Sequence, residues 1–257
     1  MDFAHWRRRL EAQRGGAVAW APSNSSPPRR VAVARLLRAY AGSEGAERDV
    51  AGALLAGAEN EDDRAALGVI LDDERRHADI LLEAARRLDP AQAPPEPPAS
   101  RRIARLLWIM RPLGFLDTLT VLHLLEVAAV AVYRLVRATN RHDRLVRGAL
   151  GLILRDEAAH AAFHEERLVE ALAAAGPVRR LRMRAVHALA ARLIVDNDRS
   201  VVPREVYLAA TGMAFEPWNE RVIRSYERAY SGGLTILRTG ASRGEAGAPG
   251  WCAGRRT

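Results

Sequence analysis

Two histidines of this sequence each follow an Asp-Glu pair at the same spacing. The first copy contains Glu74 and His77, and the second contains Glu157 and His160. Residues three apart on a helix lie on the same face, so the glutamate and histidine of each copy can bind one metal ion together. Mixed carboxylate and imidazole ligands suit iron or manganese. The alternative interpretation of each copy is a charged pair on a solvated helix face.

A third glutamate, Glu126, stands alone in the apolar stretch 119–136. A lone carboxylate on a buried helix needs a compensating partner, and a metal ion would supply one. Glu126 and Glu157 also lie at similar distances on either side of the turn that begins at Asn140. In an antiparallel helix pair, both carboxylates would therefore lie at similar heights.

The segment before the first copy offers two candidate glutamates, Glu47 and Glu44, at suitable distances from a turn near Asn60. We prefer Glu47, because the apolar residues Ala51, Leu54 and Ala58 continue its helix face. The face of Glu44 would continue through Arg48. Glu44 stays open as the alternative.

A glutamate, a Glu-x-x-His, a second glutamate and a second Glu-x-x-His, in this order, resemble the ligand set of the ferritin-like di-iron carboxylate proteins. The resemblance implies an all-α fold, a ferritin-like four-helix bundle with a long crossover, followed by additional C-terminal helices. It implies two iron ions (Fe/Fe, or Fe/Mn) as cofactors. Their expected ligands are Glu47 (or Glu44), Glu74, His77, Glu126, Glu157 and His160.

The same resemblance implies that the aspartate before each motif glutamate accepts a hydrogen bond from the histidine of the other motif. Asp73 would then bind His160, and Asp156 would bind His77, which would fix the orientation of each ring.

Three further residues are candidates for the surroundings of the site. His123 lies one turn before Glu126 and could line a substrate pocket, add a ligand or belong to the core. Tyr133 is a candidate pocket residue. His164 follows His160 by one turn and is expected beside the ligands or at the surface.

The expected organisation comprises an N-terminal extension (1–30), the di-metal bundle (31–175), accessory helices packed on the bundle (176–231) and a disordered tail (232–257). Five prolines between residues 89 and 100 predict an extended connection. Apolar spacing predicts helices over 30–40, resuming toward 58 after glycines at 42 and 45, and over 63–88, 102–111, 116–138, 143–174, 180–195 and 217–230.

The composition excludes several other classes of function. Every basic residue is an arginine, so Schiff-base and phosphate-loop lysines are absent from the sequence. Cys252 is the single cysteine, so neither a disulfide within the chain nor a Cys-x-x-Cys metal site can form. The first residues show no apolar signal segment, and we expect a cytoplasmic protein without a membrane partner.

These observations predict a di-iron oxygenase or oxidase that activates dioxygen and hydroxylates, N-oxygenates, desaturates or cleaves a small organic substrate. An external electron donor and O2 are expected partners, and a homodimer is a possible assembly. The net charge of +8 leaves a tRNA-modifying di-iron hydroxylase as an alternative. A third hypothesis is a non-enzymatic, ferritin-like iron-handling protein.

Overall fold

The computed structural model describes residues 6, 8, 10–12, 16–58, 61–91, 114–198 and 202–226, and within these ranges it leaves the side chains of 46–50, 53, 191 and 193–198 undescribed. All regular structure in this part of the chain is helical, which confirms the all-α prediction. The labelled helices are α2 (Pro27–Ala56), α3 (Glu61–Leu88), α5 (Phe115–Thr139), α6 (Arg144–Ala174), α7 (Pro177–Asp198) and α8 (Arg204–Thr211). Residues 215–226 are also helical. The expected helix at 102–111 and the expected tail at 232–257 lie outside the described residues.

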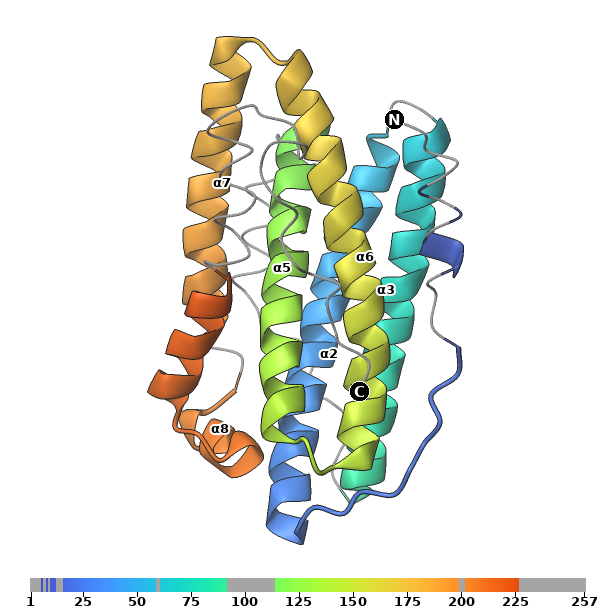
Figure 1. Cartoon of the computed structure of the whole chain (residues 1–257), viewed down its shortest axis with the longest axis vertical. Coiled ribbons are helices and arrows are strands. Elements are labelled where there is room, and N and C mark those ends of the chain that lie inside the picture. Colours follow the sequence, from blue (N-terminus) through green and yellow to red (C-terminus); the bar gives the residue numbers. More distant parts are fainter. Residues whose placement is uncertain are drawn as a thin grey trace, which may run out of the picture.

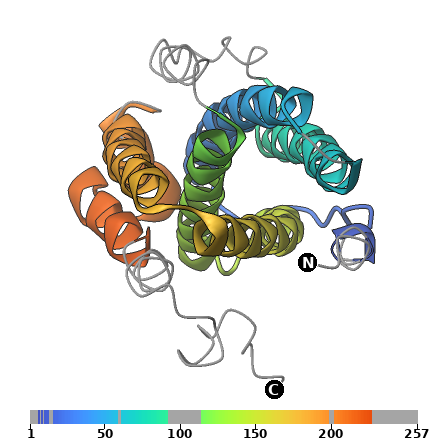
Figure 2. The ribbon, with the colours of Figure 1, turned by 90° about the horizontal axis from the view of Figure 1, so that it is seen from above.

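The four long helices pack as two antiparallel pairs, α2 with α3 and α5 with α6 (Figure 1). The pairs also contact each other, α2 against α5 and α3 against α6. Seen from above, the four helices surround a common interior (Figure 2). Side chains that point inward from any two of them can therefore meet.

The turn between α5 and α6 is fixed by Asp143. The Asp143 carboxylate accepts hydrogen bonds from the backbone N–H groups of Leu145 and Val146, which caps α6. The hydroxyls of Ser23 and Ser25 also donate to Asp143. The start of α6 is therefore tied to the segment that precedes α2.

The prediction of an interruption at residues 42–45 is wrong, because α2 is continuous from Pro27 to Ala56. A glycine inside a helix costs only about 1 kcal/mol relative to alanine. The packing of α2 along α3 and α5 outweighs this cost, so both glycines stay helical.

Two of the labelled helices, α7 and α8, lie on the outside of the four. Helix α7 lies along α5, and α8, which the sequence pattern did not predict, packs against α2 (Figure 1). Helix α5 is long and apolar enough to cross a membrane, but 67% of its most apolar window is buried inside the protein. The core helix of a soluble protein passes the same test of length and composition.

The buried apolar side chains form two clusters, one toward each end of the four helices. On α2, the first cluster ends at Ala41 and the second begins at Ala51. On α6, the first cluster ends at Ile153 and the second begins at Ala159. The candidate ligands lie where the two clusters meet, with Glu126 and His160 at the edge of the second cluster.

Candidate di-metal centre

Two groups of buried carboxylates and imidazoles meet in the layer between the apolar clusters. The first group contains Glu44, Glu74, His77 and Glu157. The second contains Glu74, Glu126, Glu157 and His160. In each group, one oxygen or nitrogen per residue lies within 4.8 Å of the corresponding atoms of the others. Because Glu74 and Glu157 belong to both groups, the two candidate ion positions are adjacent.

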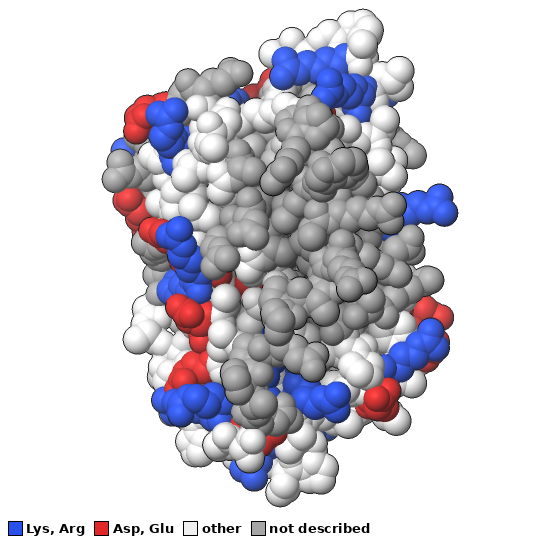
Figure 3. Space-filling model, turned by 180° about the vertical axis from the view of Figure 1, so that it is seen from behind, with Lys and Arg blue, Asp and Glu red and all other residues white. Residues whose placement is uncertain are grey.

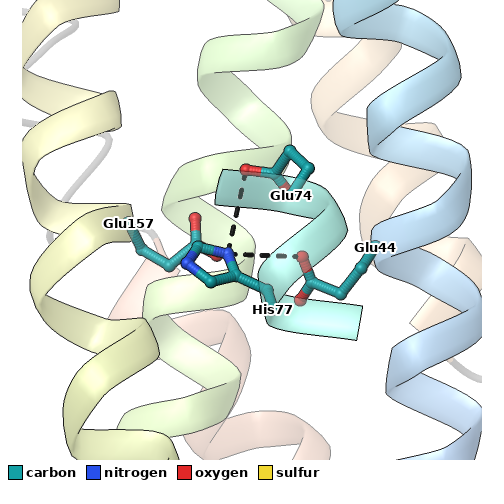
Figure 4. Close-up of side chains that lie close together, drawn as sticks. All are labelled: Glu44, Glu74, His77 and Glu157. Atoms are coloured by element: carbon teal, nitrogen blue, oxygen red, sulfur yellow. Dashed lines mark ion pairs between the residues drawn. The ribbon is translucent and has the colours of Figure 1, made fainter. Parts of the chain in front are cut away.

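The first group is arranged around the Nδ1 atom of His77 (Figure 4). This nitrogen lies 3.0 Å from Glu157 Oε1, 3.8 Å from Glu44 Oε2 and 3.9 Å from Glu74 Oε1. The side chains come from α2, α3 and α6 and converge on one volume. The motif pair on α3 is thus completed by glutamates from two other helices.

The second group repeats this arrangement around His160. Its Nδ1 atom lies 3.3 Å from Glu74 Oε1, 3.6 Å from Glu126 Oε2 and 4.0 Å from Glu157 Oε2. The His77 and His160 rings have centroids 5.8 Å apart and are inclined by 30°. The twofold repeat in the sequence therefore becomes an approximate twofold arrangement in space.

The inward-facing atoms of these residues lack hydrogen-bond partners. Both oxygens of Glu74, Glu126 and Glu157 and the Nδ1 atoms of His77 and His160 are buried without one. All five residues are 0% exposed, so the interpretation as charged pairs on solvated faces is wrong. Buried charges are normally paired or coordinate a metal. Four carboxylates would balance the charge of two divalent cations, so the residues fit a pair of metal ions.

Without a metal ion, the ionised form of this carboxylate cluster is electrostatically unfavourable. Burial raises the pKa of the Glu74 carboxyl well above its ordinary value, and the neighbouring Glu157 raises it further. Burial, with the charge of Glu126 next in size, likewise raises the pKa of Glu157. Burial alone would lower the pKa of His160, but the carboxylates beside the ring raise it well above its ordinary value. Protons therefore compensate this cluster when no cation does.

The outer nitrogen of each ring meets an aspartate of the other motif. His77 Nε2 lies 3.2 Å from Asp156 Oδ2, and His160 Nε2 lies 3.3 Å from Asp73 Oδ2. These are the two crossed pairings that the resemblance implies. Each contact leaves the Nδ1 atom directed at the glutamates.

Arg76 joins these two pairings, which the sequence analysis did not foresee. Its Nη2 atom lies 2.9 Å from Asp73 Oδ1 and 2.7 Å from Asp156 Oδ2. One guanidinium group thus holds the two aspartates that orient His77 and His160. In the sequence, Arg76 is indistinguishable from its neighbour Arg75, which pairs with an exposed aspartate.

The first group takes its α2 carboxylate from Glu44, the alternative of the sequence analysis, and our preference for Glu47 stays a prediction. The side chain of Glu47 lies outside the described residues. Glu44 is 1% exposed and accepts a hydrogen bond from the Tyr133 hydroxyl. The buried Ala51 lies two turns beyond Glu44 on the same helix face, so this face points into the bundle.

Three further histidines extend from the second group toward α7. His164 is 0% exposed and its Nδ1 atom lies 3.8 Å from Glu126 Oε1. His123 is half-buried on α5, and burial together with the charge of His187 lowers its pKa to about 4. His187, on α7, is buried, which lowers its pKa to about 4 as well. His123 and His187 are therefore neutral near pH 7.

An open cavity of about 550 Å³ lies elsewhere, at the turn between α6 and α7. It is lined by Gly114, Leu116, Asp117, Gly176, Pro177, Val178, Arg179 and Arg182. Asp117 precedes Glu126 by two and a half turns of α5, which is roughly 14 Å along the helix axis. This cavity is therefore separate from the Glu/His cluster.

No protein-family model and no curated protein sequence matches this chain. Its function is therefore inferred from the Glu/His cluster itself.

Proposed function

We propose that this chain is a ferritin-like di-iron carboxylate enzyme that uses dioxygen to oxidise a small organic substrate. The observation that carries the proposal is the pair of overlapping, fully buried Glu/His groups that share Glu74 and Glu157. The order of the four long helices and their antiparallel pairing support a ferritin-like arrangement. The connection between α3 and α5 lies largely outside the described residues.

The donor set favours iron, or iron with manganese. Oxygen and imidazole donors suit these metals, and the described residues place no thiolate in the cluster. Iron bound there would supply the redox chemistry that reduces dioxygen.

The protein's own contribution is orientation and exclusion of water. The contacts from Asp156 to His77 and from Asp73 to His160 hold both rings with Nδ1 facing the glutamates. The ligand side chains are buried, so reactive oxygen species formed at this layer would be separated from bulk solvent. Oxidation would then be confined to a substrate that reaches the interior.

The nucleic-acid alternative has weaker support. On the face shown in Figure 3, the described arginines alternate with aspartates and glutamates along the margins. Many arginines of the described helices are paired in this way, including Arg64 with Glu61 and Arg75 with Asp72. Among the described residues of that face, Figure 3 therefore shows no continuous basic strip.

The test begins with metal content. The purified protein, loaded with Fe(II) under anaerobic conditions, should bind about two ions per chain, by the count of ligands. Glu126→Ala should lose at least one of them. Glu166→Ala is the control, because it removes a glutamate that is exposed on α6 and lies outside the cluster. This variant should bind both ions.

Oxygen reactivity then separates an enzyme from an iron-binding protein. Mixing the Fe(II)-loaded protein with oxygen in a stopped-flow instrument should consume oxygen and produce a transient visible absorption. An inert Fe(II) protein, with or without candidate substrates, would refute the oxidase proposal. A cage of many subunits that takes up far more iron than two ions per chain would indicate storage instead.

A further inference from the structure

His164 is a buried histidine whose ring has no hydrogen-bond partner. It is 0% exposed, and neither Nδ1 nor Nε2 has one. It lies on α6, one turn beyond His160, so the two rings share a helix face. A buried polar side chain without a hydrogen-bond partner requires an explanation, such as a bound ion.

The position of the ring relative to Glu126 supplies this explanation. His164 Nδ1 lies 3.8 Å from Glu126 Oε1, and His160 Nδ1 lies 3.6 Å from Glu126 Oε2. The Glu126 carboxylate is therefore flanked by two imidazoles. A separation of 3.8 Å is too long for a hydrogen bond. Two ligands that bind one ion at about 2.1 Å each are separated by about 3–4.2 Å, depending on the angle between them. The Glu126–His164 pair meets this range, while His164 lies outside the two groups whose atoms are all within 4.8 Å of one another, so its ring would move closer when an ion binds.

The equivalent glutamate of the first group has a different neighbour. Glu44 accepts a hydrogen bond from the hydroxyl of Tyr133. The aspartate contacts of the two histidines, by contrast, are nearly identical in the two groups. The approximate twofold symmetry is therefore broken at the outer glutamates, by a hydroxyl on one side and an imidazole on the other.

We propose that His164 is a third imidazole ligand, bound to the metal ion held by Glu126 and His160, and that the two metal positions are consequently unequal. This inference rests on the proposed di-metal centre. The position beside Glu126 would have two nitrogen donors, and the position beside Glu44 would have one. Imidazole favours iron over manganese, whereas carboxylates suit manganese well. In a mixed-metal protein, iron would therefore occupy the His164 side.

The first experiment counts the imidazole ligands directly. In the Co(II)-loaded protein, each bound histidine should give a strongly shifted, solvent-exchangeable ring N–H signal in the proton NMR spectrum. We expect three such signals, from His77, His160 and His164, in the wild type and two in His164→Gln. His187→Gln, which changes a buried histidine on α7, is the control and should keep all three.

The second experiment measures the two binding steps. Anaerobic Fe(II) titration of the wild type should show two unequal steps, and His164→Gln should weaken the tighter step by roughly 10–100-fold. In His164→Ala, added imidazole should restore both the tight step and the third NMR signal. This rescue distinguishes a ligand from a residue that only fills space.

The outcomes separate the two proposals. If the wild type binds no metal, the di-metal proposal fails. If it binds two ions but shows only two shifted imidazole signals, the di-metal centre stands and the role of His164 is refuted. Unchanged affinity of a folded His164→Gln variant, judged by circular dichroism, would refute it as well. Should that variant not fold, the wild-type signal count still decides.

Discussion

Replacement of Arg76 by glutamine tests whether one guanidinium group controls both halves of the cluster. Arg76 contacts Asp73 and Asp156, and these aspartates contact the rings of His160 and His77. Without the cation, two buried carboxylates lose their shared partner. We expect both rings to lose their fixed orientation, so that metal affinity falls at both positions.

The magnitude follows from the burial of the three groups. Breaking a fully buried ion pair costs about 3–5 kcal/mol. The Arg76 side chain is 26% exposed, so solvent compensates part of this loss. We therefore expect Arg76→Gln to lower the free energy of unfolding by roughly 2–3 kcal/mol. Loss of a residue that orients metal ligands typically lowers metal affinity by about 10–100-fold, equivalent to about 1.4–2.8 kcal/mol.

Arg75→Gln is the matched control, because it changes the same residue type at the adjacent position. Arg75 pairs with Asp72, and both side chains are more than half exposed. Such surface pairs contribute about 0–1 kcal/mol. Urea unfolding and anaerobic Fe(II) titration should therefore distinguish the two variants. Equal metal affinity in both, or a loss in Arg76→Gln confined to one metal position, would refute the argument that Arg76 serves both halves.

Three further perturbations test other parts of the structure. Tyr133→Phe removes the hydroxyl that donates to the buried Glu44. We expect the free energy of unfolding to fall by about 1–3 kcal/mol and metal binding to weaken only at the position beside Glu44. Equal weakening of both binding steps would contradict this. Asp143→Ala removes the cap of α6, which should lower thermal stability by about 0.5–2 kcal/mol without changing metal stoichiometry, as measured by calorimetry and metal analysis. Since burial raises the pKa of Glu74 and Glu157, metal binding must displace protons, so apparent affinity should rise with pH. The folding stability of the metal-free protein should depend on pH in the opposite direction. Carboxyls whose pKa is higher in the folded than in the unfolded state stabilise the folded protein at low pH, and this stability is lost as pH rises through the folded-state pKa values. Affinity independent of pH would show that these carboxyls are already ionised.

Sequence analysis identified most readily the ligands whose positions have no ordinary structural explanation. Glu126 stands in an apolar helix, so its burial and its need for a partner could both be predicted, and the structure places it in the second group. The two motifs were visible because their spacing matches one helix turn. Helix type and approximate bounds also followed from apolar spacing.

What could not be predicted depends on contacts between distant segments. Glu44 and Glu47 differ by one turn, and only the packing of α2 on its neighbours brings Glu44 beside His77. The bridge from Arg76 to Asp156 spans two helices, and nothing in the local sequence separates Arg76 from Arg75. The α8 helix has eight residues, too few for a clear apolar period.

The polar layer between the two apolar clusters has a consequence for how the protein unfolds. Each cluster is a core in its own right, and the layer that joins them contains four carboxylates that repel one another when ionised. In the metal-free state, at a pH where these carboxyls are ionised, the two ends of the molecule should therefore open separately, with amide exchange fastest in the middle of the helices. Ions bound by shared Glu74 and Glu157 would convert this repulsion into attraction and link the two cores. The metal-bound cluster would then couple the two cores, so that the protein unfolds in a single cooperative transition.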